Sequence, residues 1–295
     1  MPTREQRPGT RSSWLRLKAA VGLAMLVVAT AALLLYQFGD LGGPASQAAM
    51  ARPTVTPWPA ATRLSASGGI SRSVVVVGIG DSVTSGRACN CENFVGLYAT
   101  GLASRQGLTT SSVNLGVDGL TSSQLLQNLT QAGTFRDQVA KADILLVTIG
   151  ANDLVPLESR QSQGCATTCY APLVESVGHN VELIVAAARA AHPGHPPTIL
   201  VTNYWNVFED GDVGTADNGQ SFQKWSDLLT RAANRQICDA AHRSGATCVD
   251  LYAPFKGDGS KNPTALLASD GDHPNSAGHQ LIASTLLAGT PMPLP

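Results

Sequence analysis

Ser82 stands in a glycine-rich turn directly after a run of β-branched residues, and it is placed to act as a nucleophile. Segment 78–86 reads Gly-Ile-Gly-Asp-Ser-Val-Thr-Ser-Gly. A serine at a strand-to-helix turn is exposed at the end of the sheet, and its backbone N–H can face the oxyanion formed in acyl transfer. Ser82 is therefore a candidate nucleophile. The competing interpretation is a serine that only caps a helix.

A carboxylate and a histidine lie three residues apart near the C-terminus. Asp270 can reach one ring nitrogen of His273 within a single turn, which fixes the tautomer and leaves the other nitrogen to accept the serine proton. Asp272 adjoins His273, but adjacent side chains usually point apart, so Asp270 is the preferred partner. His279 is interpreted as a packed or solvated helix residue. The pattern predicts His273 as general base, oriented by Asp270.

Two further segments could supply donors to the oxyanion. Asn152 lies in the sequence Thr-Ile-Gly-Ala-Asn-Asp after a buried strand, so its amide can face the space in front of Ser82 if the two preceding strands are neighbours. Such a donor contributes roughly 3–4 kcal/mol to the transition state. Gly116, in segment 114–119 after another strand, could bring a backbone N–H close.

Several other functions are excluded by the sequence. The turn is not a G-x-G-x-x-G dinucleotide loop, because Val83 stands where the third glycine is required. No G-x-S-x-G segment occurs, which argues against the elbow of α/β-hydrolases. Residues 52–295 carry 15 basic and 19 acidic residues, a net charge of −4, so this part has no basic footprint for nucleic acid.

Strands and helices alternate from residue 73 onward. The predicted strands are Ser73–Ile79, Ser112–Leu115, Ile144–Ile149, Thr198–Asn203 and Thr247–Leu251, and the predicted helices are Phe94–Ser104, Thr121–Leu129, Tyr170–Ala191, Ser221–Ser244 and Ser276–Ala288. This alternation predicts one three-layer α/β domain over 73–295, with a five-stranded parallel sheet. In such sheets function gathers at the carboxyl ends of the strands, where the segments described above lie.

Three short motifs in this order resemble those of the SGNH hydrolases, also called GDSL esterases and lipases. They are G-D-S at 80–82, G-x-N-D at 150–153 and D-x-x-H at 270–273, and the resemblance spans about 74–288. It implies a flavodoxin-like sheet of order 2-1-3-4-5 and a shallow, open site. It also implies oxyanion donors from the N–H groups of Ser82 and Gly116 and from the Asn152 side chain. Val83 replaces the leucine of the family's name, and Asp81 and Asp153 are interpreted as loop-bracing residues.

An apolar run near the N-terminus predicts export. Residues 1–18 include five basic residues, and residues 19–36 are uncharged, which is about the minimum length for a bilayer span. The basic flank predicts a cytoplasmic N-terminus with the rest of the chain outside. The run is interpreted as a transmembrane anchor, and a signal peptide cleaved near Ala49-Met50-Ala51 is the alternative. Residues 37–72 are predicted to form a flexible linker.

Six cysteines in three close pairs agree with export. The predicted disulfides are Cys89–Cys91, Cys165–Cys169 and Cys238–Cys248. Cross-pairing between the first two pairs is the alternative, because both loops leave the same edge of the sheet. A zinc site would need a C-x-x-C pair with a matching second pair, and the sequence has none. The two histidines within 192–195 flank a proline and a glycine, which indicates a turn.

Together these patterns predict an extracytoplasmic serine esterase or lipase. We expect it to need no cofactor or metal and to act as a monomer on a small-molecule, lipid or glycan ester. Tyr204, Trp205, Val207 and Phe208 could line an acyl pocket or anchor a buried loop. Two alternatives stay open: an acyltransferase or carbohydrate O-deacetylase on the same site, and a non-catalytic binding protein of the cell envelope.

Overall fold

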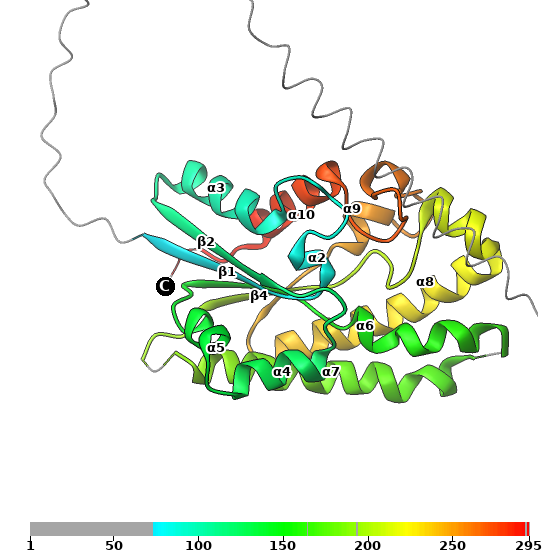
Figure 1. Ribbon diagram of the computed structural model, residues 1–295, viewed down its shortest axis with the longest axis horizontal. Coiled ribbons are helices and arrows are strands. Elements are labelled where there is room, and N and C mark those ends of the chain that lie inside the picture. Colours follow the sequence, from blue (N-terminus) through cyan, green and yellow to red (C-terminus); the bar gives the residue numbers. More distant parts are fainter. Residues whose placement is uncertain (1–72, 164, 193, 293, 295) are drawn as a thin grey trace, which may run out of the picture. The chain divides into compact units, whose positions relative to one another are not determined.

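The structure of this protein is a computed structural model that describes residues 73–163, 165–192, 194–292 and 294 (Figure 1). The chain divides into two units, Met1–Ala66 and Ser67–Pro295, and every described residue belongs to the second. The predicted cytoplasmic segment 1–18, apolar segment 19–36 and linker 37–72 lie outside the described residues. None of the helices within the described ranges combines the length and hydropathy needed to cross a bilayer.

Five parallel strands form a single sheet in the order β2-β1-β3-β4-β5, which confirms the predicted fold. The strands are β1 Val74–Gly80, β2 Thr110–Gly116, β3 Ile144–Thr148, β4 Thr198–Thr202 and β5 Thr247–Val249. The central strand β3 is buried along its whole length, as its continuous apolar run requires. Strand β2 begins two residues before the predicted start, because this edge strand is partly exposed and its polar residues hide the pattern.

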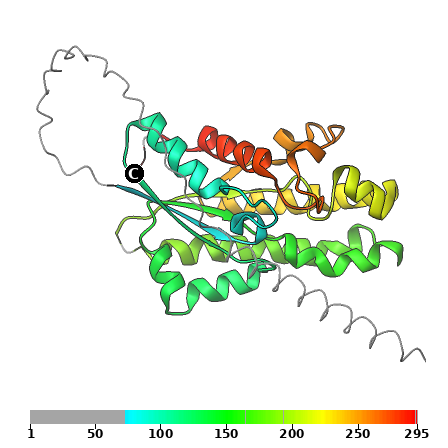
Figure 2. The ribbon, with the colours of Figure 1, turned by 45° about the horizontal axis from the view of Figure 1, so that its top comes forward.

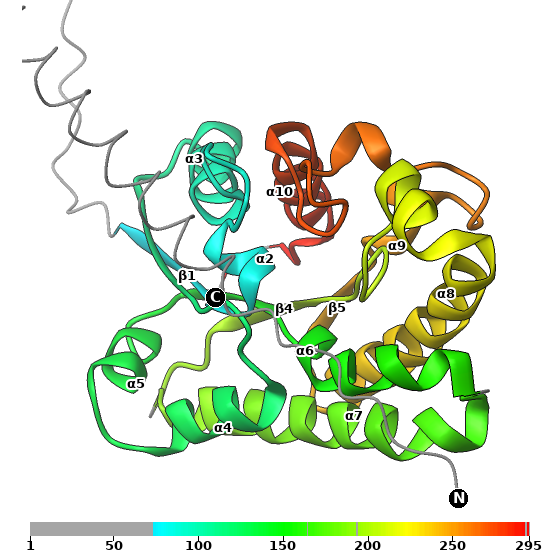
Figure 3. The same ribbon diagram turned by 45° about the vertical axis from the view of Figure 1, so that its right-hand side comes forward.

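Helices cover both faces of the sheet (Figure 3). Helices α3 (Phe94–Gln106) and α10 (Ser276–Gly289) pack together on one face. On the other face α7 (Thr167–Ala190) packs against both α4 (Ser122–Thr130) and α8 (Gly211–Arg243). Figure 2 shows the two helical layers, with red α10 beside cyan-green α3 and the green helices α4 and α7 across the sheet. This is the predicted three-layer arrangement.

Short helices are the main elements that the sequence did not predict. They are α2 Ser82–Ser85, α5 Thr134–Val139, α6 Ala151–Leu154, the 3-10 helix η1 Val155–Gln163, α9 Tyr252–Lys256 and the 3-10 helix η2 Thr264–Leu266. Elements of this length are too short to show a clear helical period. Helix α8 begins ten residues before the predicted start, and its backbone is interrupted at Gly219, where φ is 78°. The predicted helix from Ser221 corresponds to the part after this kink.

The structure joins the cysteines within each close pair. Their Cα–Cα distances are 5.1 Å for Cys89–Cys91, 5.3 Å for Cys165–Cys169 and 5.1 Å for Cys238–Cys248. The last pair links α8 to β5, so it ties a helix to the edge of the sheet. In the first two pairs the partners are two and four residues apart, so they stiffen short segments and contribute little loop-closure entropy.

Candidate active site

Together with His273, residues that follow the carboxyl ends of β1, β3 and β4 line one small pocket. Its volume is about 50 Å³, and it is lined by Ser82, Asn152, Tyr204, Trp205, Val207 and His273, among others. Ser82 and Asn152 follow neighbouring strands, because β1 pairs directly with β3. His273 comes from the loop before α10. The structure therefore brings three of the predicted site residues together although they are far apart in the sequence.

Ser82 is the first residue of α2, and the turn before it depends on glycine. At Gly80 the φ angle is +136°, and a Cβ there would lie 1.8 Å from the carbonyl oxygen of Thr148. The Asp81 carboxylate caps α2 by accepting a hydrogen bond of 3.1 Å from the Val83 N–H. The Ser82 N–H has no acceptor within its own helix, since the first N–H groups of a helix have no residue four positions earlier inside it. This geometry allows the Ser82 N–H to act as an oxyanion donor beside the Ser82 hydroxyl, the candidate nucleophile.

The pair of Asp270 and His273 forms the expected contact. Nδ1 of His273 lies 2.8 Å from Oδ2 of Asp270, and the His273 backbone N–H donates to Oδ1 of the same carboxylate at 3.0 Å. Asp272 is further away, with its Oδ2 3.7 Å from Nδ1. Burial alone would raise the pKa of Asp270, but the hydrogen bonds from the His273 backbone and ring and from the Asp272 N–H lower it. An ionised Asp270 fixes the tautomer in which Nε2 is free to accept a proton.

Asn152 lies in α6, immediately after the turn that follows β3. Its side-chain N–H donates to the carbonyl oxygen of Leu120 at 3.1 Å, which fixes the orientation of the amide. An amide nitrogen carries two N–H groups, so a second donor is left for a substrate oxygen. The adjacent Asp153 accepts hydrogen bonds from the Ser122 N–H (2.9 Å) and hydroxyl (2.6 Å), which ties α6 to the start of α4. Asp153 thus occupies a bracing position, as the sequence indicated.

Gly116 is not among the residues that line the pocket. Its N–H donates to the side chain of Asn114 at 2.9 Å, so this donor already has an acceptor. Its close packing explains the glycine, because a Cβ would lie 2.2 Å from the backbone nitrogen of Ser85. The structure therefore gives Gly116 a packing role against α2. Its predicted role as oxyanion donor would require Asn114 to release the N–H.

A buried hydrogen-bond network beneath Ser82 was only partly visible in the sequence. The Asp81 carboxylate accepts hydrogen bonds from the hydroxyl of Thr148 (2.8 Å) and from the hydroxyl of Tyr204. Thr84 in turn lies 2.7 Å from the Thr148 hydroxyl. These contacts join the ends of β1, β3 and β4 under the nucleophile. Tyr204 could not be assigned from sequence, because it lies 123 residues from Asp81 and no local pattern links the two.

Burial raises the pKa of Asp81 to about 6, although the hydrogen bonds from Tyr204, Thr148 and Val83 lower it. Between about pH 4 and 6 the folded protein holds a proton at Asp81 that the unfolded chain has released. This contribution to the free energy of unfolding therefore falls as pH rises through that window.

We predict that the free energy of unfolding of Asp81→Asn, which cannot titrate at this position, rises by about 2 kcal/mol relative to that of the wild type between about pH 4 and 6.5. Chemical denaturation of both proteins across this range measures the difference, and contributions of other groups cancel in the comparison. Stability curves that stay parallel would contradict the burial of an ionisable Asp81.

His279 is packed, which agrees with one of the two interpretations of this residue. Its side chain is fully buried, its Nδ1 accepts from the Phe94 N–H at 3.3 Å, and its ring stacks on Phe94. Burial, together with the nearby His273, lowers the pKa of His279 to about 4. Cys89 and Cys91 have sulfur atoms within 4.8 Å of a ring nitrogen of His279, a spacing that could suit a metal ion. The structure joins these sulfurs in a disulfide, whereas metal binding needs thiolates.

Comparisons with known proteins agree with this geometry. Residues 79–281 match the model of the GDSL-like Lipase/Acylhydrolase family. The chain belongs to this family. The matched region contains Ser82, Asn152, Asp270 and His273, and membership supports a carboxylic ester hydrolase. A search of curated proteins found no match.

Solved structures of the same fold include several esterases. The lipase Lip_vut3 from a goat rumen metagenome is 21% identical, with a TM-score of 0.60, and the match covers 74% of this chain and 97% of that one. A variant of the acetyl xylan esterase Axe2 from Geobacillus stearothermophilus is 20% identical, with a TM-score of 0.51, and the match covers 73% and 94%. At these identities the likeness concerns the fold, and the family match carries the reaction class.

Proposed function

We propose that the protein is an extracytoplasmic serine esterase that hydrolyses carboxylic esters through an acyl-serine intermediate. The observation that carries this proposal is the convergence of Ser82, Asn152 and His273 on one pocket, with Asp270 hydrogen-bonded to His273. In the first step the Ser82 hydroxyl attacks the ester carbonyl while Nε2 of His273 takes its proton. The alcohol leaves with that proton, and an ester bond joins the acyl group to Ser82. Water then attacks this bond, releases the acid and restores the serine.

The Asn152 amide and the Ser82 N–H are the donors that we assign to the oxyanion. A donor that acts mainly on the transition state changes kcat much more than KM. We predict that Asn152→Ala lowers kcat roughly 10²–10³-fold with little change in KM. Steady-state kinetics with 4-nitrophenyl acetate measures both constants, and a change confined to KM would mean that Asn152 only binds the substrate.

The pocket volume favours a short acyl group. About 50 Å³ is several times smaller than the roughly 300–1,000 Å³ of typical pockets for larger ligands. The side chains of Trp205 and Val207 are buried and bound this space, so it cannot widen on their side without repacking. Phe208 packs instead against Phe222, with ring centroids 5.7 Å apart, and anchors its loop. We infer a preference for acetyl esters over long-chain esters.

A panel of 4-nitrophenyl acetate, butyrate and octanoate tests the proposed activity. We expect kcat/KM to fall by at least about tenfold from acetate to octanoate, since a small site rejects added methylenes. Higher activity on octanoate would refute the short-acyl assignment, and no hydrolysis of any ester would refute the esterase. Acetylated oligosaccharides belong in the panel, because a carbohydrate O-deacetylase uses the same small acyl pocket. Some neighbours of the same fold are acetyl xylan esterases.

The extracytoplasmic location rests on the sequence. Five basic residues precede the uncharged run 19–36, and the cysteines pair as expected for an oxidising compartment. A fusion of residues 1–72 to alkaline phosphatase, which is active only after export, tests the location. Phosphatase activity is expected in cells that carry the fusion, and its absence with a stable fusion protein would contradict export.

A further inference from the structure

A second and larger cavity lies between the start of α8 and the segment that runs from α9 toward η2. Its volume is about 530 Å³, within the roughly 300–1,000 Å³ typical of ligand pockets. The side chains that the argument uses are Asp210, Thr215, Gln223, Asp227, Leu228 and Lys256. The reaction proposed above uses none of them.

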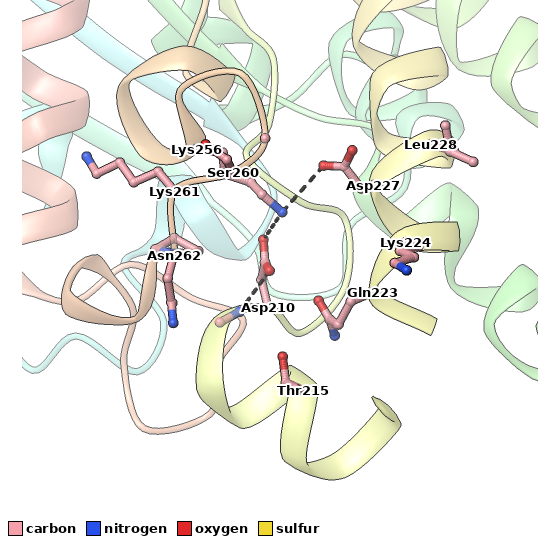
Figure 4. A pocket seen from close by; sticks show the side chains of 13 residues that line it. Asp210, Thr215, Gln223, Lys224, Asp227, Leu228, Lys256, Ser260, Lys261 and Asn262 are labelled. Atoms are coloured by element: carbon pink, nitrogen blue, oxygen red, sulfur yellow. Dashed lines mark hydrogen bonds and ion pairs between the residues drawn. The ribbon is translucent and has the colours of Figure 1, made fainter. Parts of the chain in front are cut away.

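The centre of this cavity holds a buried ammonium group between two carboxylates (Figure 4). Nζ of Lys256 lies 2.6 Å from Oδ2 of Asp210 and 3.4 Å from Oδ1 of Asp227, and Lys256 is 6% exposed. Asp227 also accepts a 2.8 Å hydrogen bond from Nε of Arg231. A buried charge is costly unless it is paired, so Lys256 is held in place by its two carboxylate partners. An ammonium group has three N–H donors, and these two carboxylates account for two of them.

The lining indicates what kind of ligand the cavity suits. The lining contains both hydrogen-bond donors and acceptors, and within the described residues the Oε1 atom of Gln223 is buried with no hydrogen-bond partner. Leu228 is the only large aliphatic side chain among the residues that line the cavity, and it is 61% exposed, so the lining does not suit a fatty acyl chain. The lining carries charges of both signs, the carboxylates of Asp210 and Asp227 and the ammonium groups of Lys224, Lys256 and Lys261, so it does not select an anion or a cation. A hydroxyl group both donates and accepts, which suits this mixture.

We propose that this cavity is a saccharide subsite that binds a neutral sugar ring. Its role as a subsite for the alcohol half of the ester rests on the proposed function. That it binds a sugar at all is argued from the residues that line it and does not depend on the esterase. Val207 lines the catalytic pocket and Asp210 lines the cavity, and the three-residue step between them spans at most about 11 Å. The Asp210 N–H also donates to the carbonyl oxygen of Gly271 at 2.8 Å, inside the turn that carries His273. The distance between the two sites along this segment is therefore within the length of a short oligosaccharide.

Binding of unmodified oligosaccharides tests the site without any chemistry. The probes are xylotetraose, cellotetraose and chitotetraose at up to about 10 mM, followed through the methyl NMR signals of Leu228 and by calorimetry. We expect at least one of the three to bind to Ser82→Ala as tightly as to the wild type. Thr215→Trp places a large ring in the cavity from an exposed helix position and should weaken binding by at least about tenfold. Ala216→Trp, at the next exposed position, is the matched control and should bind like the wild type.

The outcomes separate this proposal from the esterase itself. If no neutral tetrasaccharide binds, or if Thr215→Trp binds as well as Ala216→Trp, the saccharide subsite is wrong. Binding of tetragalacturonate alone would equally overturn the assignment of a neutral sugar. If the protein proves not to hydrolyse esters, these binding results still stand, because binding is measured on Ser82→Ala as well. If both proposals hold, Thr215→Trp raises KM for an acetylated tetrasaccharide and leaves kcat/KM for 4-nitrophenyl acetate unchanged.

Discussion

The Ser82→Ala variant is expected to lose ester hydrolysis by about 10⁴-fold or more, because the nucleophile and the acyl-enzyme both depend on its hydroxyl. Residual activity would come from the oxyanion donors and from substrate binding. The fold should be retained, since the Asp81 cap and the glycine turn that shape α2 do not use the Ser82 side chain. Hydrolysis of 4-nitrophenyl acetate and a thermal melt of the same sample measure activity and folding together.

Ser85→Ala is the matched control for this variant. Ser85 lies on the same short helix, and its hydroxyl, which has one proton to donate, lies within hydrogen-bond distance of both the Ser82 carbonyl oxygen (3.0 Å) and Asp118. Loss of these partly exposed bonds should leave most of the activity. If Ser82→Ala retained more than a few per cent of wild-type kcat/KM while Ser85→Ala lost activity, the nucleophile would have to be reassigned.

The Asp270→Asn variant should show the second largest effect, a fall in kcat of roughly 10²–10⁴-fold. An amide at this position can present its NH₂ group to Nδ1 of His273, which favours the tautomer whose Nε2 already carries a proton. It also removes a carboxylate 2.8 Å from the ring, which stabilises the imidazolium formed during the reaction. The fall in activity toward acid pH should therefore move to lower pH. A pH–rate profile of wild type and variant measures both effects.

The Asp272→Asn variant distinguishes the roles of the two carboxylates near His273. Because Oδ2 of Asp272 lies 3.7 Å from Nδ1, against 2.8 Å for Asp270, this substitution should cost at least about tenfold less in kcat than Asp270→Asn. If Asp272→Asn lowers kcat more than Asp270→Asn does, Asp272 is the residue that orients His273. The same holds if the fall in activity toward acid pH does not move in Asp270→Asn.

The features that could be predicted from the sequence are those that depend on residues close together in the chain. The strands before Ser82 and Asn152 are continuous apolar runs, and the contact of Asp270 with His273 spans one turn of the chain. Parallel pairing of β1 with β3 then brings these residues to one edge of the sheet. The α/β fold class and the closeness of Ser82, Asn152 and His273 could therefore be predicted from residue order and spacing, whereas the strand order was implied by the family resemblance.

The features that the sequence missed depend on contacts between distant loops. Tyr204, after β4, reaches Asp81, after β1, across the one strand between them, β3, and Lys256 meets Asp210 over 46 residues. Neither pair has a pattern at short range. The hydrogen bond from the Gly116 N–H to the Asn114 side chain is a further contact that the sequence does not show, and the donor role of Gly116 stays a prediction. The start of α8 was missed because Gly219 interrupts its period. For Tyr204 and Lys256, tertiary packing decides a contact that local sequence leaves open.

Labelling of the intact protein with a fluorophosphonate tests most directly the claim that Ser82 is an activated nucleophile. The probe phosphonylates an activated serine, so mass spectrometry of the digested protein should find one adduct, on the peptide that contains Ser82. The adduct should be absent from Ser82→Ala and should form in parallel with the loss of esterase activity. An adduct on another residue, or full loss of hydrolysis without any adduct at Ser82, would contradict the proposed mechanism, and an unlabelled, inactive protein would indicate a non-catalytic binding protein.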